Sequence, residues 1–480
     1  MYMAALAALV GLAYANSFPG EFHFDDYAWF LNNPDLTEGS FRYASFLDHY
    51  GGRPLTLWTL HLNYALWGDW VPGYHAVSLL LHVLAALGLF LLLTRRWQGP
   101  EGNRPENGNP PAPGAGDRLL SKPWAWAAAA LFALHPLQTQ PVNYIWSRSM
   151  LLMTVFSLAA LLLAGRSRWA AMAAWQMALW SRMDAIVLLP FLLLTERRAR
   201  RPWLVQAGAN VALFGFSLVF YSPPEVAWNH DSPWAFWMAQ PAALAEYLRL
   251  MLWPSQLTIE HHFQPVLTGW LAGAALLAAA TVFLVALWRR RDGRWTLPAL
   301  ALAWLLAWLA PSMLIPNADL INESRAYLAL AGGAAALCWG LQRLSLTRPG
   351  SAMWSASALA ALLIWSGWAV SERNLLWQDD VALYREAVLR SPQQMRVHYN
   401  LGSALARRGA AAEAEMHFRR ALHMEPLDDL NHSALGYCAE VQGRVEEALG
   451  HYRRALQLNS NNRRAAEGLD RLLAGPEDAL

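Results

Sequence analysis

The chain has 480 residues, of which 55% are hydrophobic and only 15% are charged, and its formal net charge at pH 7 is +2. Its apolar runs recur at lengths that can cross a hydrocarbon core about 30 Å thick. The composition therefore indicates a polytopic helical membrane protein, and the small net charge gives no reason to expect a nucleic-acid partner.

Eleven apolar segments, several of them short, follow one another along the chain. They are residues 1–18, 73–94, 124–141, 149–165, 168–181, 184–195, 203–221, 266–288, 297–315, 325–341 and 351–370. The first lacks the charge pattern and cleavage site of a secretory leader, so we interpret it as a retained span. Cys338 lies in an apolar segment and Cys438 in the polar tail, so we expect no disulfide between them.

Cationic residues cluster in five connections, and each connection follows an even-numbered segment. The clusters are Arg95 to Lys122, Arg166 with Arg168, Arg197 to Arg201, Arg289 to Arg294, and Arg343 with Arg348. Because positive charge is retained on the cytoplasmic side, this pattern predicts a cytoplasmic N-terminus and an external C-terminus.

The connections themselves differ in character. Residues 99–117, rich in Pro, Gly and Asn, are typical of a disordered cytoplasmic linker. Two longer loops, about 19–72 and 222–265, fall on the external face. Each contains a stretch that predicts a helix lying along the interface, at residues 53–64 and 247–254.

The C-terminal tail repeats itself. Leu401-Gly402 returns as Leu435-Gly436, 34 residues later. A period of about 34 with small residues at the helix contacts is typical of tetratricopeptide repeats. We predict a membrane domain over 1–371 and a repeat domain over 372–480, the latter with a partial repeat at 372–394, repeats at 395–428 and 429–462, and a capping helix at 463–474. Such an array either binds a peptide or protein, or serves as a structural cap.

Two adjacent carboxylates, Asp25 and Asp26, follow the first segment. They could be a solvated loop start or a helix N-cap. Acidic residues beside lipid are costly, however, so they also suggest a functional site. A carboxylate is a weak base, which suits a reaction in which the proton of an acceptor hydroxyl leaves late, as in glycosyl transfer. Either Asp25 or Asp26 could be that base.

Four arginines lie at or near external ends of apolar segments, namely Arg53, Arg148, Arg182 and Arg325. Guanidinium groups there could hold a phosphate at the membrane surface, or each could pair with a local acid such as Asp184 or Glu323. The best metal candidate is Glu260-His261-His262, but a tight metal-binding spacing is missing, so we predict no metal site.

An ordered series of short motifs runs along the chain. It comprises Phe24-Asp25-Asp26, Asn33-Pro34, Arg53-Pro54-Leu55, Leu62-Asn63-Tyr64, Gly73-Tyr74-His75, Leu80-Leu81-His82, Leu131 to Val142, Leu252-Trp253-Pro254, Glu323 to Leu328, and Arg373-Asn374 with Trp377. With the repeats, the series resembles the transmembrane and tetratricopeptide-repeat O-mannosyltransferases and their bacterial relatives. Two positions depart from the family pattern: Arg182-Met183 replaces a Lys-Glu pair, and Ser149 replaces an Asp after the arginine.

The resemblance implies an all-α protein with about eleven spans, similar to the C-type, lipid-linked glycosyltransferases. It implies an external active site, a polyprenyl-phosphate-linked sugar donor, inversion at the sugar carbon, and a catalytic carboxylate at Asp25 or Asp26. We expect His75, His135 and Glu323 to support the site. We predict no cofactor, and the sequence leaves open whether a divalent metal assists.

From these observations we expect a glycosyltransferase of the bacterial inner membrane that faces the periplasm and transfers a sugar to a hydroxyl of a protein captured by the repeats. We favour Asp25 as the base because it lies nearer the first span. The alternative is a non-catalytic membrane anchor that carries a protein-binding repeat scaffold. A transporter would place ionisable residues at mid-span, whereas these charges lie at segment ends.

Overall fold

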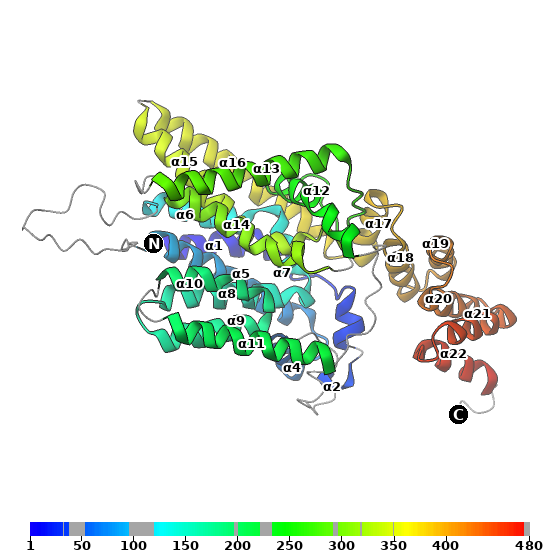
Figure 1. Cartoon of the computed structure of the whole chain (residues 1–480). Coiled ribbons are helices and arrows are strands. Elements are labelled where there is room, and N and C mark those ends of the chain that lie inside the picture. Colours follow the sequence, from blue (N-terminus) through cyan, green and yellow to red (C-terminus); the bar gives the residue numbers. More distant parts are fainter. Residues whose placement is uncertain are drawn as a thin grey trace, which may run out of the picture. The chain divides into compact units, whose positions relative to one another are not determined.

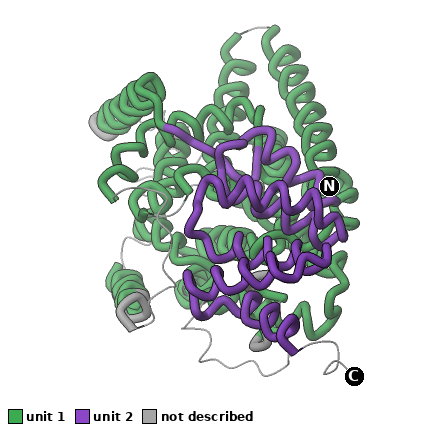
Figure 2. Tube along the Cα trace, turned by 90° about the vertical axis from the view of Figure 1, so that its right-hand side faces the viewer, with its two compact units in different colours: residues 1–257, 265–378 green, residues 258–264, 379–480 purple. Residues whose placement is uncertain are grey.

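The computed structural model of the chain describes residues 1–31, 33–37, 53–95, 120–195, 200–220, 233–290, 296–316, 319–348 and 350–474. The chain divides into two compact units (Figure 2), Met1–Leu257 with Pro265–Gln378, and Thr258–Gln264 with Asp379–Leu480. Helices and turns make up the regular structure of the described residues, as the all-α prediction requires. The predicted linker at 99–117 lies outside them.

The long helices of the first unit run alongside one another (Figure 1). They are α1 Tyr2–Ala13, α4 Pro54–Trp67, α5 Val71–Thr94, α6 Lys122–Leu134, α8 Arg148–Leu163, α9 Arg168–Ser181, α11 Arg200–Phe220, α12 Pro233–Leu252, α13 Leu267–Arg290, α14 Thr296–Leu314, α15 Ala329–Thr347 and α16 Ser351–Leu376. Shorter elements connect them: η1 Ala15–Ser17, η2 Asp26–Leu31, α2 Pro34–Thr37, η3 Pro136–Gln138, α7 Thr139–Asn143, η4 Ile145–Ser147, η5 Met183–Leu188, α10 Leu189–Thr195 and η6 Glu323–Ala326.

Five helices among the described residues are long and apolar enough to cross a membrane. They are Val71–Thr94, Ile145–Leu163, Leu267–Ala286, Leu297–Leu314 and Ser351–Leu376. Several of the other predicted segments form shorter helices, so the count of eleven spans stays a prediction.

The segment predicted at 124–141 is not one helix. Helix α6 ends at Leu134, and His135 adopts an extended backbone with ψ of 133°. The following residue is Pro136, whose ring disfavours a helical conformation for the residue before it. The chain continues as the short elements η3 and α7, which bring polar side chains toward one end of the bundle.

Both stretches predicted as interfacial helices are helical. Residues 53–64 contribute to α4, with Pro54 in its first turn, where a missing backbone N–H costs nothing. Residues 247–252 form the end of α12, and Pro254 follows that end closely.

The second unit consists of paired helices: α17 Asp380–Arg390, α18 Met395–Arg407, α19 Ala411–Met424, α20 Asp429–Val441, α21 Val445–Leu458 and α22 Arg463–Ala474. The small residues noted in the sequence lie where helices meet. A Cβ atom on Gly402 would lie 2.7 Å from the ring of Phe418, and one on Gly436 would lie 2.7 Å from the ring of Tyr452. Only glycine therefore allows each pair to pack this closely.

The division between the units falls after Gln378, whereas the sequence suggested residue 371. Helix α16 continues unbroken to Leu376, because Arg373 and Asn374 are buried and hydrogen-bonded within the first unit. Residues 258–264 belong to the second unit. There the Glu260 carboxylate pairs with Arg396 at 2.6 Å, and the Ser391 hydroxyl donates to the Glu260 carbonyl at 2.7 Å.

A pair of histidines occurs in each full repeat. The Nδ1 atoms of His398 and His417 are 3.1 Å apart, and those of His432 and His451 are 3.2 Å apart. Nε2 of His398 lies 3.2 Å from the Pro392 carbonyl, so it carries the proton there. Its Nδ1 is then left to accept from His417. Burial lowers the pKa of all four histidines.

These histidines predict an acid-sensitive repeat unit. Because their folded pKa values lie below the unfolded value of about 6.5, the unfolded chain takes up protons first as the pH falls. Stability should be complete above about pH 6.5 and decrease below it. Thermal unfolding of the purified chain between about pH 7.5 and about pH 5.5 would measure this slope.

The double variant His417→Gln with His451→Gln should show a flatter slope. His423→Gln, which changes an exposed histidine on α19, is the matched control and should keep the wild-type slope. An unchanged slope in the double variant would show that the pairs do not cause the acid sensitivity.

Candidate functional site

A tight turn at residues 23–26 forms the centre of the candidate site. The N–H of Asp26 donates to the His23 carbonyl at 2.8 Å, and the Asp26 carboxylate accepts the N–H of His23 at 2.9 Å. The other carboxylate oxygen accepts the N–H of Trp146 at 2.7 Å. Asp26 thus closes its own turn and fastens it to η4.

Asp26 is completely buried. Burial raises the pKa of its carboxyl, whereas the N–H groups of His23 and Trp146 lower it because they donate to both oxygens of the ionised form. Both carboxylate oxygens are engaged by backbone groups. This geometry fits a residue that shapes the site. Of the two interpretations of the acids, structural or functional, it supports the structural one for Asp26.

Asp25 has a different environment. Its Oδ2 atom accepts the hydroxyl of Tyr144 at 2.8 Å, and its own N–H donates to that hydroxyl at 3.3 Å. Phe24, immediately before it, has a φ of +44°, which is uncommon for a bulky residue. Strained backbone of this kind concentrates at functional sites. Asp25 is therefore a half-buried carboxylate held in a defined position.

Tyr144 is itself fixed by aromatic contacts. Its ring centroid lies 6.3 Å from that of Trp377 in a stacked arrangement, and 5.9 Å from that of Phe24. Trp377 follows α16, and its carbonyl lies 3.1 Å from Nε2 of His23. Two distant parts of the chain, residues 144–146 and Trp377, thus hold the Asp25 turn.

Three of the four predicted arginines gather around one acid. Arg182 pairs with Asp184 at 2.7 Å, and the charges of Arg53 and Arg325 also act on the Asp184 carboxylate. The Arg53 guanidinium in turn interacts electrostatically with Asp25 and Tyr144. We call this set the acid–arginine rim: Asp25, Tyr144, Arg53, Arg182, Asp184 and Arg325.

Local packing explains why Arg53 and Arg182 meet. Arg53 immediately precedes α4 and Arg182 immediately follows α9. The Thr56 hydroxyl on α4 donates to the Ser181 carbonyl on α9 at 3.4 Å, which joins these two helix ends. Burial lowers the pKa of Arg53 to about 10, so its guanidinium keeps its charge at neutral pH.

Arg325 lies in η6 and donates to the Asp319 carbonyl at 2.7 Å. It is half-buried, like Asp25. The charge of Arg325 also acts on the Asp184 carboxylate, whereas Glu323 forms an ion pair with Arg373.

Arg148 makes its hydrogen bonds within the helix bundle, and its charge acts on Asp26. The arginine is buried, and its guanidinium donates to the Asn63 side chain and to the carbonyls of Thr59, at 3.3 Å, and Tyr74, at 3.2 Å. These bonds join α8 to α4 and α5.

Two of the three supporting residues have structural partners. His135 accepts the Leu137 N–H through Nδ1 at 3.2 Å, and its Nε2 lies 3.0 Å from the Met251 carbonyl, so it caps η3. Glu323 forms a buried ion pair with Arg373 at 3.0 Å. Arg373 also donates to Thr139 at 3.1 Å and to the Leu257 carbonyl at 3.0 Å.

His75 is the third. It is 2% exposed, and neither ring nitrogen has a hydrogen-bond partner among the described residues. A Cβ atom on Gly20 would lie 2.6 Å from its Nε2, so glycine is what allows the chain to pass this close.

Metal-binding geometry is not found in the described residues, which contain no group of three or more His, Cys, Asp and Glu able to hold an ion. In the motif Glu260-His261-His262, Glu260 pairs with Arg396, and the His262 N–H donates to the Ser391 hydroxyl at 3.2 Å. Those contacts give the motif a structural role in the second unit.

Sequence reasoning missed some of the site. Nothing in the pattern around Tyr144 marks it as the partner of Asp25, and Asp184 was considered only as a local acid for one arginine. Arg373 was present in the motif series, but its ion pair with Glu323 joins residues that are 50 positions apart.

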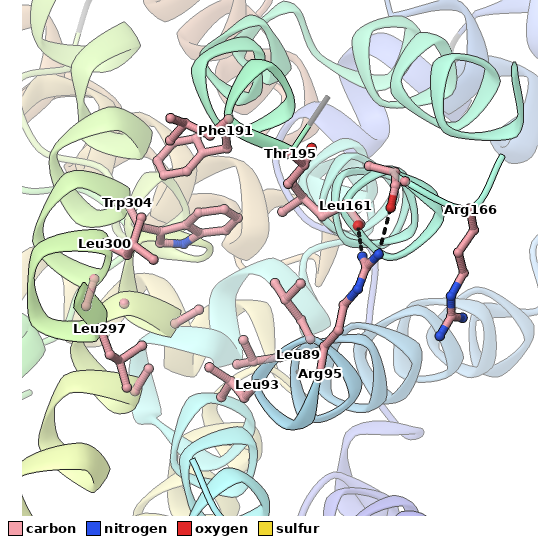
Figure 3. A pocket seen from close by; sticks show the side chains of 18 residues that line it. Leu89, Leu93, Arg95, Leu161, Arg166, Phe191, Thr195, Leu297, Leu300 and Trp304 are labelled. Carbon is pink, nitrogen blue, oxygen red and sulfur yellow. Dashed lines mark hydrogen bonds between the residues drawn. The ribbon is translucent and has the colours of Figure 1, made fainter. Parts of the chain in front are cut away.

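A cavity of about 530 Å³ lies elsewhere in the first unit (Figure 3). Its lining includes the final residues of α5 and α8, whereas the Asp25 turn meets the segment that precedes α8. The cavity is therefore separate from the rim.

Comparison with known proteins now places the chain among relatives. The tetratricopeptide-repeat family matches residues 380–429 and 430–462. A Caenorhabditis elegans protein O-mannosyl-transferase is 25% identical over 88% of this chain, and a human protein O-mannosyl-transferase is 25% identical over 88% of it. A mouse protein O-mannosyl-transferase is 31% identical over 32% of this chain.

These relatives confirm the resemblance and the C-terminal repeats predicted from the sequence. The chain covers 62% of the length of the worm protein, 55% of the human one and 21% of the mouse one.

The buried pair Glu323–Arg373 gives a test of the fold around the site. Glu323→Ala should destabilise the first unit by about 3–5 kcal/mol, because it leaves the Arg373 charge buried without its counter-ion. Thermal unfolding in detergent would measure the loss.

Glu246→Ala is the matched control. It breaks the more exposed pair with Arg249 and should cost only about 0–1 kcal/mol. Replacing both Glu323 and Arg373 with apolar residues should recover part of the loss. If Glu323→Ala and Glu246→Ala lower the stability equally, the buried pair contributes no more to stability than the exposed pair.

Proposed function

We propose that the chain is a membrane glycosyltransferase that moves a sugar from a polyprenyl-phosphate-linked donor to a hydroxyl of a protein. The observation that carries this proposal is the acid–arginine rim. There the positioned carboxylate of Asp25 lies within electrostatic reach of Arg53, and the charges of Arg53, Arg182 and Arg325 all act on Asp184. The names of the relatives support the same reaction class.

In the proposed reaction the acceptor oxygen forms a bond to the anomeric carbon while the bond from that carbon to the carrier phosphate breaks. The hydroxyl proton passes to Asp25, and the electron pair of the broken bond leaves with the carrier phosphate. Attack from the face opposite the leaving group inverts the sugar carbon. A carboxylate can serve as the base here because the proton departs late.

Asp25 suits the role of base better than Asp26. The Asp26 oxygens accept two backbone N–H groups in a fully buried position, whereas Asp25 is half-buried. The Tyr144 hydroxyl holds one oxygen of Asp25 in place. We assign Asp26 the role of positioning Asp25 through the turn.

The arginines of the rim suit a leaving phosphate. Negative charge grows on the phosphate oxygens as the sugar departs, and fixed guanidinium groups stabilise that charge most strongly in the transition state. Arg53 and Arg325 are the main candidates, because Arg182 is already paired with Asp184. Arg148 makes its bonds inside the helix bundle, so we give it a structural role instead.

We propose that the rim faces the outside of the membrane. The direction of α5 and α8 supports this, since both begin near the rim and end at Arg95 and near Arg166. Those arginines belong to the connections that the charge rule assigns to the cytoplasm. The repeats would then lie on the external side, where they could present a protein acceptor.

The role of Asp25 can be tested directly. Asp25→Asn should reduce sugar transfer at least about 100-fold, because the amide cannot take the acceptor proton. It should change stability little. Transfer from a polyprenyl-phosphate sugar, measured in proteoliposomes with thermal unfolding alongside, separates the two effects.

Asp26→Asn should lower stability as well as transfer, because Asp26 holds the turn that positions Asp25. The variant's amide NH₂ would face a backbone N–H, which leaves a buried group unsatisfied and costs about 1–3 kcal/mol of stability. Asp69→Asn, at an exposed acid between α4 and α5, serves as the control and should change neither quantity. Full transfer activity in Asp25→Asn would refute the assignment. Absence of transfer by the wild type across sugar donors would favour the scaffold alternative.

A further inference from the structure

The cavity of the first unit lies between helix ends. Its volume of about 530 Å³ is within the range of about 300–1,000 Å³ typical of ligand sites. Most of the lining is aliphatic or aromatic, with Leu89, Leu93, Phe191, Leu297, Leu300 and Trp304 prominent in Figure 3. Water in such a cavity would find few polar partners, so an apolar occupant is favoured.

Positive charge lies at one side of this cavity. Arg95 donates to the carbonyls of Leu161 at 2.6 Å and Ala164 at 2.7 Å, which closes the C-terminal end of α8 and fixes Arg95 as part of the wall (Figure 3). Arg166 also lines the cavity, and its side chain is exposed. A negatively charged group beside the cavity would meet this guanidinium.

A second arginine of the lining adds to that charge. Described residues 95 and 164–166, which line the cavity, include Arg95 and Arg166 but no Asp or Glu, and the charge of Arg166 acts on Arg95. The cavity thus combines an apolar interior with a cationic border. A bilayer phospholipid with an anionic headgroup has the complementary chemistry, and basic pockets between membrane helices are typical binding sites for such headgroups.

We propose that this cavity binds an anionic phospholipid, with one acyl chain among Leu89, Leu93, Leu300 and Trp304 and the phosphate beside Arg166. The acyl chain fills a space that would otherwise leave its apolar lining without contacts. The phosphate neutralises a cationic border that has no acid of its own in the segments named above.

This site is distinct from the acid–arginine rim. The Asp25 turn is bonded to Trp146, just before α8 begins at Arg148, whereas the α8 residue that lines the cavity is Leu161. Leu161 lies 13 positions beyond Arg148, which at about 1.5 Å per residue is about 20 Å along the helix axis. The proposal therefore does not depend on the proposed transferase reaction. It predicts a bound lipid that takes no part in sugar transfer.

The experiment uses the full chain, purified in detergent and stripped of lipid. Phosphatidylglycerol or phosphatidylcholine with identical acyl chains is added, and native mass spectrometry counts the lipids that stay bound. Wild type should retain one phosphatidylglycerol, bound about fivefold more tightly than phosphatidylcholine, as expected for one arginine beside a headgroup with a net negative charge, which zwitterionic phosphatidylcholine lacks. Thermal unfolding should shift upward with phosphatidylglycerol.

Three variants make the result specific. Arg166→Gln should bring phosphatidylglycerol binding down to the level of phosphatidylcholine. Ala335→Phe, which places a ring in the cavity, should abolish binding of both lipids. Arg201→Gln, at an exposed arginine that is not part of the cavity lining, should behave like wild type.

The proposal fails if wild type binds both phospholipids equally, or if Arg166→Gln and Arg201→Gln give the same result. It also fails if polyprenyl phosphate occupies the cavity in preference to phosphatidylglycerol. Asp25→Asn should retain the phospholipid. A transfer-inactive Asp25→Asn that still binds it would separate the two proposals, because each can then be accepted or rejected without the other.

Discussion

The site depends on one buried carboxylate. Asp26 accepts the N–H groups of His23 and Trp146, and these two bonds join a short turn near the N-terminus to the start of α8. An unpaired buried carboxylate would be costly, so the turn is stable only in this docked form. The docking in turn places Asp25 beside Tyr144 and within reach of the charge of Arg53.

The requirement that buried polar groups have partners also explains contacts in the rest of the first unit. In an apolar environment each buried polar group needs a partner, and here the partners come from helices far apart in sequence. Arg373 on α16 joins Glu323 in η6 and Thr139 in α7, while Asn374 accepts from Asn143 at 2.7 Å. Arg148 fastens α8 to α4 and α5. These bonds join neighbouring helices of the bundle.

The two ends of the bundle also differ in their charged residues. At one end acids and arginines lie together, which suits a reaction that moves a proton and releases a phosphate. At the other end the described segments are cationic, and the cavity there has an apolar interior. The first arrangement can stabilise a changing charge, and the second suits a permanently anionic lipid.

From the sequence alone, the helical membrane class, the repeats and their 34-residue period followed directly, because local hydrophobic patterns and recurring small residues determine them. The sequence also identified the acids and arginines as a group of candidate site residues. The hydrogen-bond and ion-pair partners of these residues did not follow from the sequence. That Asp26 fastens its turn to Trp146, that Asp25 bonds Tyr144, and that Glu323 joins Arg373 depend on contacts across 120, 119 and 50 positions. Residue patterns along the chain carry no record of such distances, so only the tertiary packing decided which acid is buried among backbone N–H groups and which stays half-buried beside Tyr144.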